Sequence, residues 1–317
     1  GDPAPVLHVG VLEELKTKNP LSMMADDPIT ADVLLGVYER PIDHVPYDVP
    51  VPYLAKGADA DEDGTFEASE YGVFAETDTA TPLEVSIYYD FNGVRWHDGV
   101  QMDAWDLLFS HHAHAIAPLL RPDFTVLFPD VTYEPARELN VSLVDVNPAL
   151  PGYQKGWEGE GAMPGSADLR VGITFRLREP FARFENRTLA PLLLPIHVWS
   201  GTGGGRHGDF GCAIYVTPEV AASRGIPCGT SDPAKWGRGV PSTATDARPF
   251  EAAQAIAWAP TDADVVGFGP FVFRWWQPGV GGLLERHADY YVGETYDPTL
   301  LTRLHRPWIG GIVFAVY

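Results

Sequence analysis

The stretch that decides the fold is FNGVRWHDG at residues 91–99, followed closely by DAWD at residues 103–106. Before it, polar and apolar residues alternate from Leu83 to Tyr89, which predicts a half-buried strand. After it, apolar residues recur at helical spacing, and Asp103 stands where it can cap the first free N–H groups of a helix. Gly and Asp in the connecting stretch are typical of a tight turn. We therefore predict a strand–turn–helix unit, with Trp96 packed beneath the turn as an anchor.

Further short elements are predicted on both sides of this unit. Residues 7–12 read as a short buried strand, and helical spacing predicts a helix over residues 30–38. Alternation or short apolar runs predict five more strands, at residues 139–146, 170–177, 267–274, 282–286 and 309–317. Prolines between residues 41 and 52 indicate an extended crossover between two structural units.

Composition excludes several classes of partner. The 317 residues include 43 acidic and 22 basic side chains, which gives a formal charge of -21. Such a chain lacks the basic surface that nucleic acids or anionic membranes require. No apolar run reaches the ~18 residues of a membrane-spanning helix, so direct membrane insertion is not expected. The length suits about two compact lobes.

The two cysteines, Cys212 and Cys228, leave two interpretations open. They stand 16 positions apart in a glycine-rich stretch. In an oxidising compartment they could form one disulfide, which would stabilise the fold by ~3 kcal/mol through loop closure. Alternatively, they are two unrelated buried thiols.

An acidic stretch matches the D-x-D-x-D-G-x5-E pattern of a calcium-binding loop. Its oxygen-bearing positions are Asp59, Asp61, Asp63, Thr65 and Glu70. Oxygens at these positions, with a glycine at the sharp turn, suit the ligand preference of calcium. The prolines that precede the stretch prevent the usual entering helix, so a solvated acidic hairpin is the alternative. If the site exists, calcium has a structural role.

Other chemical signatures are weak. His111 and His114 are three residues apart on the predicted helix and could share a face for zinc or nickel. No carboxylate or cysteine lies at helical spacing beside them, so ordinary helix histidines are the favoured interpretation. The chain has no G-x-S-x-G elbow, no H-E-x-x-H and no phosphate-binding lysine loop. We therefore do not expect an enzyme.

Four segments, taken in order, resemble family 5 of the extracellular solute-binding proteins, the periplasmic or lipoprotein components that feed peptide-type ABC transporters. They are KNPL at 18–21 with LGVYE at 35–39, YLAK at 53–56, the FNGVRWHDG and DAWD stretches, and GFGPF at 267–271 continuing through LER at 284–286 to YY at 290–291. Each piece is short, but their order and spacing are similar to the family over most of the chain.

The resemblance implies an α/β fold, the first lobe of a type II periplasmic-binding-protein-like protein. It implies a main lobe with a mixed β-sheet, built from residues 1–44 and 171–317, and a smaller inserted α/β sub-lobe at residues 45–170. The chain departs from the family where the family enters its second lobe, so we expect that lobe to be absent from this chain.

The resemblance also implies a function. Members capture oligopeptides outside the cytoplasm by closing two lobes about a hinge, and then deliver them to an ABC permease in the membrane. Some relatives bind oligosaccharides or nickel. Methionine and aromatic side chains provide adaptable apolar walls for varied ligands. The candidate ligand-binding residues are Met23, Met24, Phe124, Phe128, Phe268 and Gly269.

Three other hypotheses about the function stay open at this point. The first is an oligosaccharide receptor of the same family, which the nine tryptophans would suit as stacking surfaces. The second is a calcium-stabilised extracellular interaction module without a small ligand. The third is an extracellular hydrolase, for which no nucleophile is marked by the sequence.

Overall fold

The computed structural model describes most of the helices and strands, and the statements below concern these residues. They are residues 4–22, 25, 27–45, 49–52, 54–59, 84–116, 139–145, 170–177, 192–200, 208–232, 235–237, 249–291 and 309–317.

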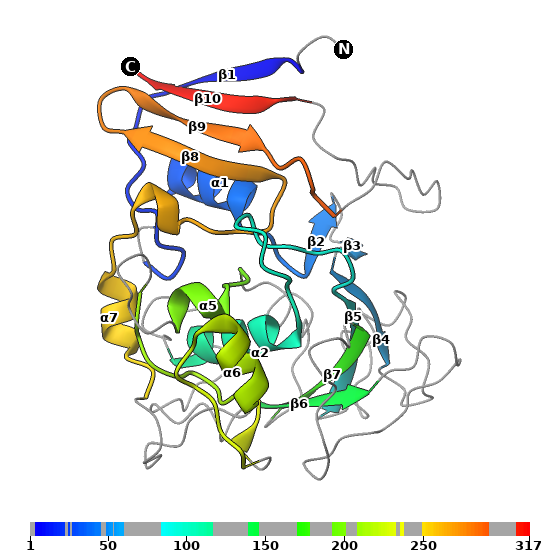
Figure 1. Ribbon diagram of the computed structural model, residues 1–317. Helices are drawn as coiled ribbons and strands as arrows, with labels where there is room; N and C mark the ends of the chain where they lie inside the picture. Colours follow the sequence, from blue (N-terminus) through cyan, green and yellow to red (C-terminus); the bar gives the residue numbers. More distant parts are fainter. Residues whose placement is uncertain are drawn as a thin grey trace.

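The main sheet joins the two ends of the chain. It contains four strands in the order β1 (Val6–Val11), β10 (Gly311–Val316), β9 (Gly281–Arg286) and β8 (Phe271–Gln277). β1 runs parallel to β10 and the other pairs are antiparallel, so the sheet is mixed. Helix α1 (Pro28–Val37) packs against β8 and β9 beneath the sheet (Figure 1).

The strand at 7–12 is predicted in the correct place but with the wrong burial. Val6 and Leu7 of β1 are 46% and 47% exposed. β1 lies at the edge of the sheet, with a partner on one side only among the described strands. Edge position depends on the order of the strands, which a short apolar run does not reveal.

A second sheet is formed by the middle of the chain. Its strands are β4 (Ala55–Asp59), β5 (Glu84–Asp90), β7 (Arg170–Leu177) and β6 (Leu139–Asp145), in that order and all antiparallel. A two-stranded ribbon of β2 (Ile42–Val45) and β3 (Val49–Pro52) precedes it. β7 pairs with β5 up to Arg176 and with β6 up to Leu177, so this sheet extends past residue 170, where the sub-lobe is expected to end. The expected boundaries stay a prediction.

The remaining described helices lie below the main sheet in Figure 1. They are α2 (Ala104–Ile116), α5 (Ile196–Trp199), α6 (Pro218–Arg224), α7 (Ala252–Ala257) and the 3-10 helix η6 (Asp262–Asp264). Local sequence sets their ends. In α6, the Thr217 side chain caps the first turn, Pro218 begins the helix, and Gly225 ends it in the left-handed conformation at φ 65°.

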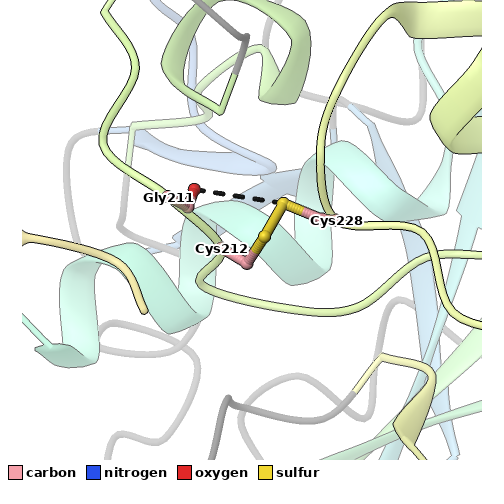
Figure 2. The surroundings of a disulfide bond; sticks show 3 residues. All are labelled: Gly211, Cys212 and Cys228. Carbon is pink, nitrogen blue, oxygen red and sulfur yellow. Dashed lines mark hydrogen bonds between the residues drawn. A yellow bond between two sulfur atoms is a disulfide. The ribbon is translucent and has the colours of Figure 1, made fainter. Parts of the chain in front are cut away.

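A disulfide joins Cys212 to Cys228, and both residues are fully buried (Figure 2). The loop that it closes contains all of α6. The dashed line in Figure 2 marks an approach of 4.0 Å between the Cys228 sulfur and the carbonyl oxygen of Gly211. Since a disulfide sulfur carries no hydrogen, we regard this as a contact rather than a hydrogen bond.

Candidate functional site

The turn at residues 96–99 connects β5 to α2 and contacts the segment just before β8. The backbone N–H of His97 donates to the carbonyl of Gly267 at 2.8 Å. The N–H of Gly267 in turn donates to Nδ1 of the His97 ring at 3.3 Å, and ring Nε2 lies 3.0 Å from the carbonyl oxygen of Gly269. Two segments that resemble the family are thus held together by one histidine, although 170 residues separate them.

Trp96 is fully buried beneath this turn, which confirms the predicted anchor. Its indole Nε1 donates to Oδ2 of Asp106 at 3.1 Å. Its ring meets Phe268 edge-on, with 5.4 Å between the ring centres. Trp96 therefore joins the start of α2 to the segment before β8.

The predicted helix start at Asp103 is also confirmed. Oδ1 of Asp103 accepts from the N–H of Trp105 at 2.9 Å, while the N–H of Asp103 donates to the carboxylate of Asp106 at 3.1 Å. Asp103 thus caps the first turn of α2, and Asp106 of the same turn accepts from the backbone N–H of the capping residue.

Asp106 connects four segments. Besides Trp96 and Asp103, its carboxylate accepts from the N–H of Ile196, at the start of α5, at 3.0 Å. Arg224 of α6 donates to Asp106 at 2.8 Å and to Asp103 at 2.7 Å. Burial raises the pKa of Asp103 to about 6, although the guanidinium of Arg224 opposes the rise. We call Asp103, Asp106 and Arg224 the carboxylate cluster.

A second polar contact joins the family-like segments at 35–39 and 290–291. The hydroxyl groups of Tyr290 and Tyr291 both donate to the carboxylate of Glu39, the latter at 3.0 Å. The ring of Tyr291 stacks on Phe268, with 6.1 Å between the ring centres. Phe268 therefore lies between Trp96 and Tyr291.

Close backbone packing explains two glycines in the GFGPF segment. A Cβ on Gly267 would lie 2.0 Å from the carbonyl oxygen of Val37, and one on Gly269 would lie 2.8 Å from the same atom. The N–H of Gly269 donates to that oxygen at 2.9 Å. The end of α1 thus rests directly on the bare backbone of this segment.

Sequence reasoning missed the role of Asn19. This residue is fully buried, and its side-chain Nδ2 donates to the carbonyls of Ala255, Ile256 and Trp258 at 2.7, 3.2 and 2.9 Å. These carbonyls lie in and just after the last turn of α7, where helix carbonyls commonly lack an internal donor; Ala255 alone of the three also accepts from the N–H of Trp258, at 3.4 Å. The Asn-Pro-Leu segment is visible in the sequence, but its partners lie more than 230 residues away.

The ligand-binding predictions are only partly covered by the described residues. Met23, Met24, Phe124 and Phe128 lie outside them. Phe268 is fully buried, and the N–H and the carbonyl of Gly269 both bond within the protein. Ligand contact at these residues stays a prediction.

The predicted calcium loop also lies outside the described residues, apart from the backbone of Asp59, which pairs with Ser86 in the second sheet. Among the residues that the structure describes, no group of three or more histidine, cysteine or acidic side chains could hold a metal ion. The calcium site stays a prediction.

The α2 histidines are buried in the core. His112 and His114 bond the carbonyls of Gly237 and Leu192 at 3.2 and 2.9 Å. Burial lowers the pKa of His111 to about 3 and that of His112 to about 4. These contacts favour the interpretation of His111 and His114 as ordinary helix histidines.

No helix among the described residues is both long enough and apolar enough to cross a membrane. No protein-family model matches the chain, and no curated protein sequence matches it.

Solved structures do match. An ABC transporter substrate-binding protein, CtaP, from Listeria monocytogenes has a TM-score of 0.53 at 16% identity, covering 100% of this chain and 41% of that one. A periplasmic oligopeptide-binding protein of Thermotoga maritima gives 0.51 at 13%, covering 100% and 39%. A dipeptide-binding protein from a Pseudoalteromonas species, in complex with Met-Leu, gives 0.50 at 13%, covering 98% and 43%.

This chain therefore spans about two fifths of the length of the solved structures that it matches. The likeness extends over the whole chain and includes the mixed main sheet. It confirms the α/β, type II periplasmic-binding-protein-like fold expected from the sequence. The chain has the fold of the solute-binding proteins of peptide-type ABC transporters, over a part of their length.

Proposed function

We propose that this chain belongs to the substrate-binding component of an ABC transporter, and that the whole protein captures oligopeptides outside the cytoplasm. One observation carries the proposal. Three of the segments that resemble the family, at 35–39, 91–106 and 267–291, meet around Trp96 and Phe268 through His97, Asp106 and Glu39. They do so within a fold shared with proteins named for binding peptides.

The mechanism that we propose is closure of two lobes about a hinge, followed by docking of the closed form on a permease. A lobe that takes part in such a motion must move as one rigid body. The buried contacts between distant segments suit this requirement, because they link the segment before β8, α2 and α6 directly. The assignment to peptides rests on the resemblance and on the names of the matching structures.

The buried disulfide supports the location. Disulfides form and persist in oxidising compartments and are rare in the cytoplasm. We accordingly propose an extracytoplasmic protein, periplasmic or anchored at the cell surface.

The test uses the protein encoded by its complete reading frame. Native mass spectra, compared with denaturing spectra of the same preparation, should show an adduct of peptide mass that is lost on denaturation. Melting curves should then shift upward with a mixed peptide library, because a ligand that binds only the folded state stabilises it. A shift with oligosaccharides alone would support the alternative receptor.

Two other outcomes would overturn the proposal. Turnover of peptides or glycosides at a catalytic rate would make the protein a hydrolase. A melting temperature that responds to calcium and chelator, but to no peptide or sugar, would indicate the calcium-stabilised interaction module instead.

A further inference from the structure

The His97 ring bonds the chain on both of its nitrogens. Nδ1 accepts from the N–H of Gly267 at 3.3 Å, and Nε2 faces the carbonyl oxygen of Gly269 at 3.0 Å. A ring nitrogen can accept a hydrogen bond from an N–H group only if it carries no proton itself. The proton of the neutral ring is therefore on Nε2, which donates a hydrogen bond to the carbonyl of Gly269. The geometry thereby fixes both the charge and the tautomer of His97.

Protonation of the ring is incompatible with this arrangement. A second proton on Nδ1 would point at the N–H of Gly267, so that two donors would face each other without an acceptor. The hydrogen bond to Gly267 would then be lost, whereas the bond from Nε2 to Gly269 could persist.

The charged and titratable groups around the ring come from three elements. The His287 ring, after β9, meets His97 edge-on with 4.7 Å between ring centres, and a charge on both rings would be repulsive. The positive charge of Arg274 in β8 also disfavours protonation of His97, although Arg274 is itself paired with Glu285. The negative charge of Asp98 favours protonation of His97, but the Asp98 carboxylate also contacts His197 at 2.7 Å. Burial is the largest influence and lowers the pKa of His97 to about 3.

The ring joins two parts of the fold. His97 follows β5 of the second sheet, and residues 267–269 lead into β8 of the main sheet. On its other side, Gly269 is held separately, because its N–H donates to the carbonyl of Val37 in α1.

We propose that His97 is an acid-sensitive clasp: in its neutral form it fastens the turn after β5 to the segment before β8, and protonation opens it at Gly267 while Gly269 stays on α1. The inference concerns the folded chain itself and holds whatever ligand the protein binds.

Amide hydrogen exchange measured by NMR tests the clasp, with Gly269 as the internal reference. The protection factor of the Gly267 amide should fall relative to that of Gly269 as the pH decreases. If the opened ring has an ordinary histidine pKa, linkage gives a shift of the opening equilibrium of roughly a hundredfold between pH 7 and pH 4.5. Imidazole nitrogen shifts should report the Nε2–H tautomer at pH 7.

His97→Gln is the matching variant, since its amide can still donate toward Gly269 but does not titrate. In this variant the ratio of the two protection factors should no longer depend on pH. His8→Gln changes an exposed histidine of β1 and should leave the ratio as in the unaltered chain.

The inference is overturned if Gly267 and Gly269 lose protection together, which would mean that no separate clasp exists. It is also overturned if the ratio stays constant down to pH 4.5, or if the tautomer at pH 7 is Nδ1–H. Should His97→Gln fail to fold, the tautomer and the pH series of the unaltered chain still decide.

Discussion

Replacement of Arg224 by methionine tests the carboxylate cluster. The guanidinium donates to Asp106, Asp103 and the carbonyl of Gln101, at 2.8, 2.7 and 3.0 Å. Methionine keeps much of the apolar volume but leaves two carboxylates without their cation. Removing one partner of a buried ion pair typically destabilises a protein by about 3–5 kcal/mol.

Of the two carboxylates, that of Asp103 should lose the larger share of its stabilising contacts in Arg224→Met. Asp106 keeps three N–H donors, from Trp96, Ile196 and the backbone of Asp103, whereas the Asp103 carboxylate keeps the N–H of Trp105. Asp103 can relieve the loss by taking up a proton, since burial already raises its pKa to about 6. An acid whose pKa is higher in the folded state gains stability as the pH falls through that value. The destabilisation should therefore be larger at pH 7.5 than at pH 5.5.

The assay is urea unfolding followed by tryptophan fluorescence at both pH values. Adding Asp103→Asn to Arg224→Met should recover part of the loss at pH 7.5, because it removes the unpaired charge. Arg286→Met is the control, since Arg286 is exposed and its replacement should change stability by about 0.5 kcal/mol or less. A loss below about 1 kcal/mol at pH 7.5, or equal losses at the two pH values, would refute the reasoning.

Three further outcomes are expected, each by thermal or urea unfolding. Asn19→Asp should destabilise the chain more than Asn19→Ala, since a carboxylate would repel the carbonyls that end α7; equal losses would contradict this role. Gly267→Ala should unfold the chain or destabilise it severely, because the added Cβ would lie 2.0 Å from a backbone oxygen. Gly36→Ala should be close to neutral, because its Cβ would meet the flexible end of Leu284 at 3.3 Å and the Phe271 ring at an ordinary contact distance of 3.8 Å. His111 and His112 have folded pKa values of about 3 and 4, below the ordinary 6.5. Their stabilisation is complete above pH 6.5 and is lost as the pH falls, by about 2 kcal/mol each at pH 5. A melting temperature unchanged between pH 7 and pH 5 in both the unaltered chain and His111→Asn would argue against this.

The strand–turn–helix unit was predictable because its determinants are local. The alternation of β5, the cap at Asp103 and the buried anchor Trp96 lie within about 25 residues and act on their immediate neighbours. Local signals of this kind fix where an element starts and which side chains it buries.

The partners of these residues were not predictable. Asp106 meets Ile196 and Arg224 across 90 and 118 residues of sequence, and nothing near either residue indicates the pairing. The prediction that β1 is buried was wrong for a similar reason, because the exposure of β1 follows from its edge position in the sheet. The resemblance marked the segments that meet around Phe268 but not the hydrogen bonds that join them.

The parallel pairing of β1 with β10 affects how the chain is made. Val6 pairs with Gly311, so these neighbours are separated by roughly 300 residues of sequence. At about 5–20 residues per second, a ribosome needs about 15–60 s to produce the second strand after the first. For that time Val6 and Leu7 have no strand beside them, and an unpaired apolar strand readily associates with other chains. The main sheet can thus close only when synthesis of this region is almost complete.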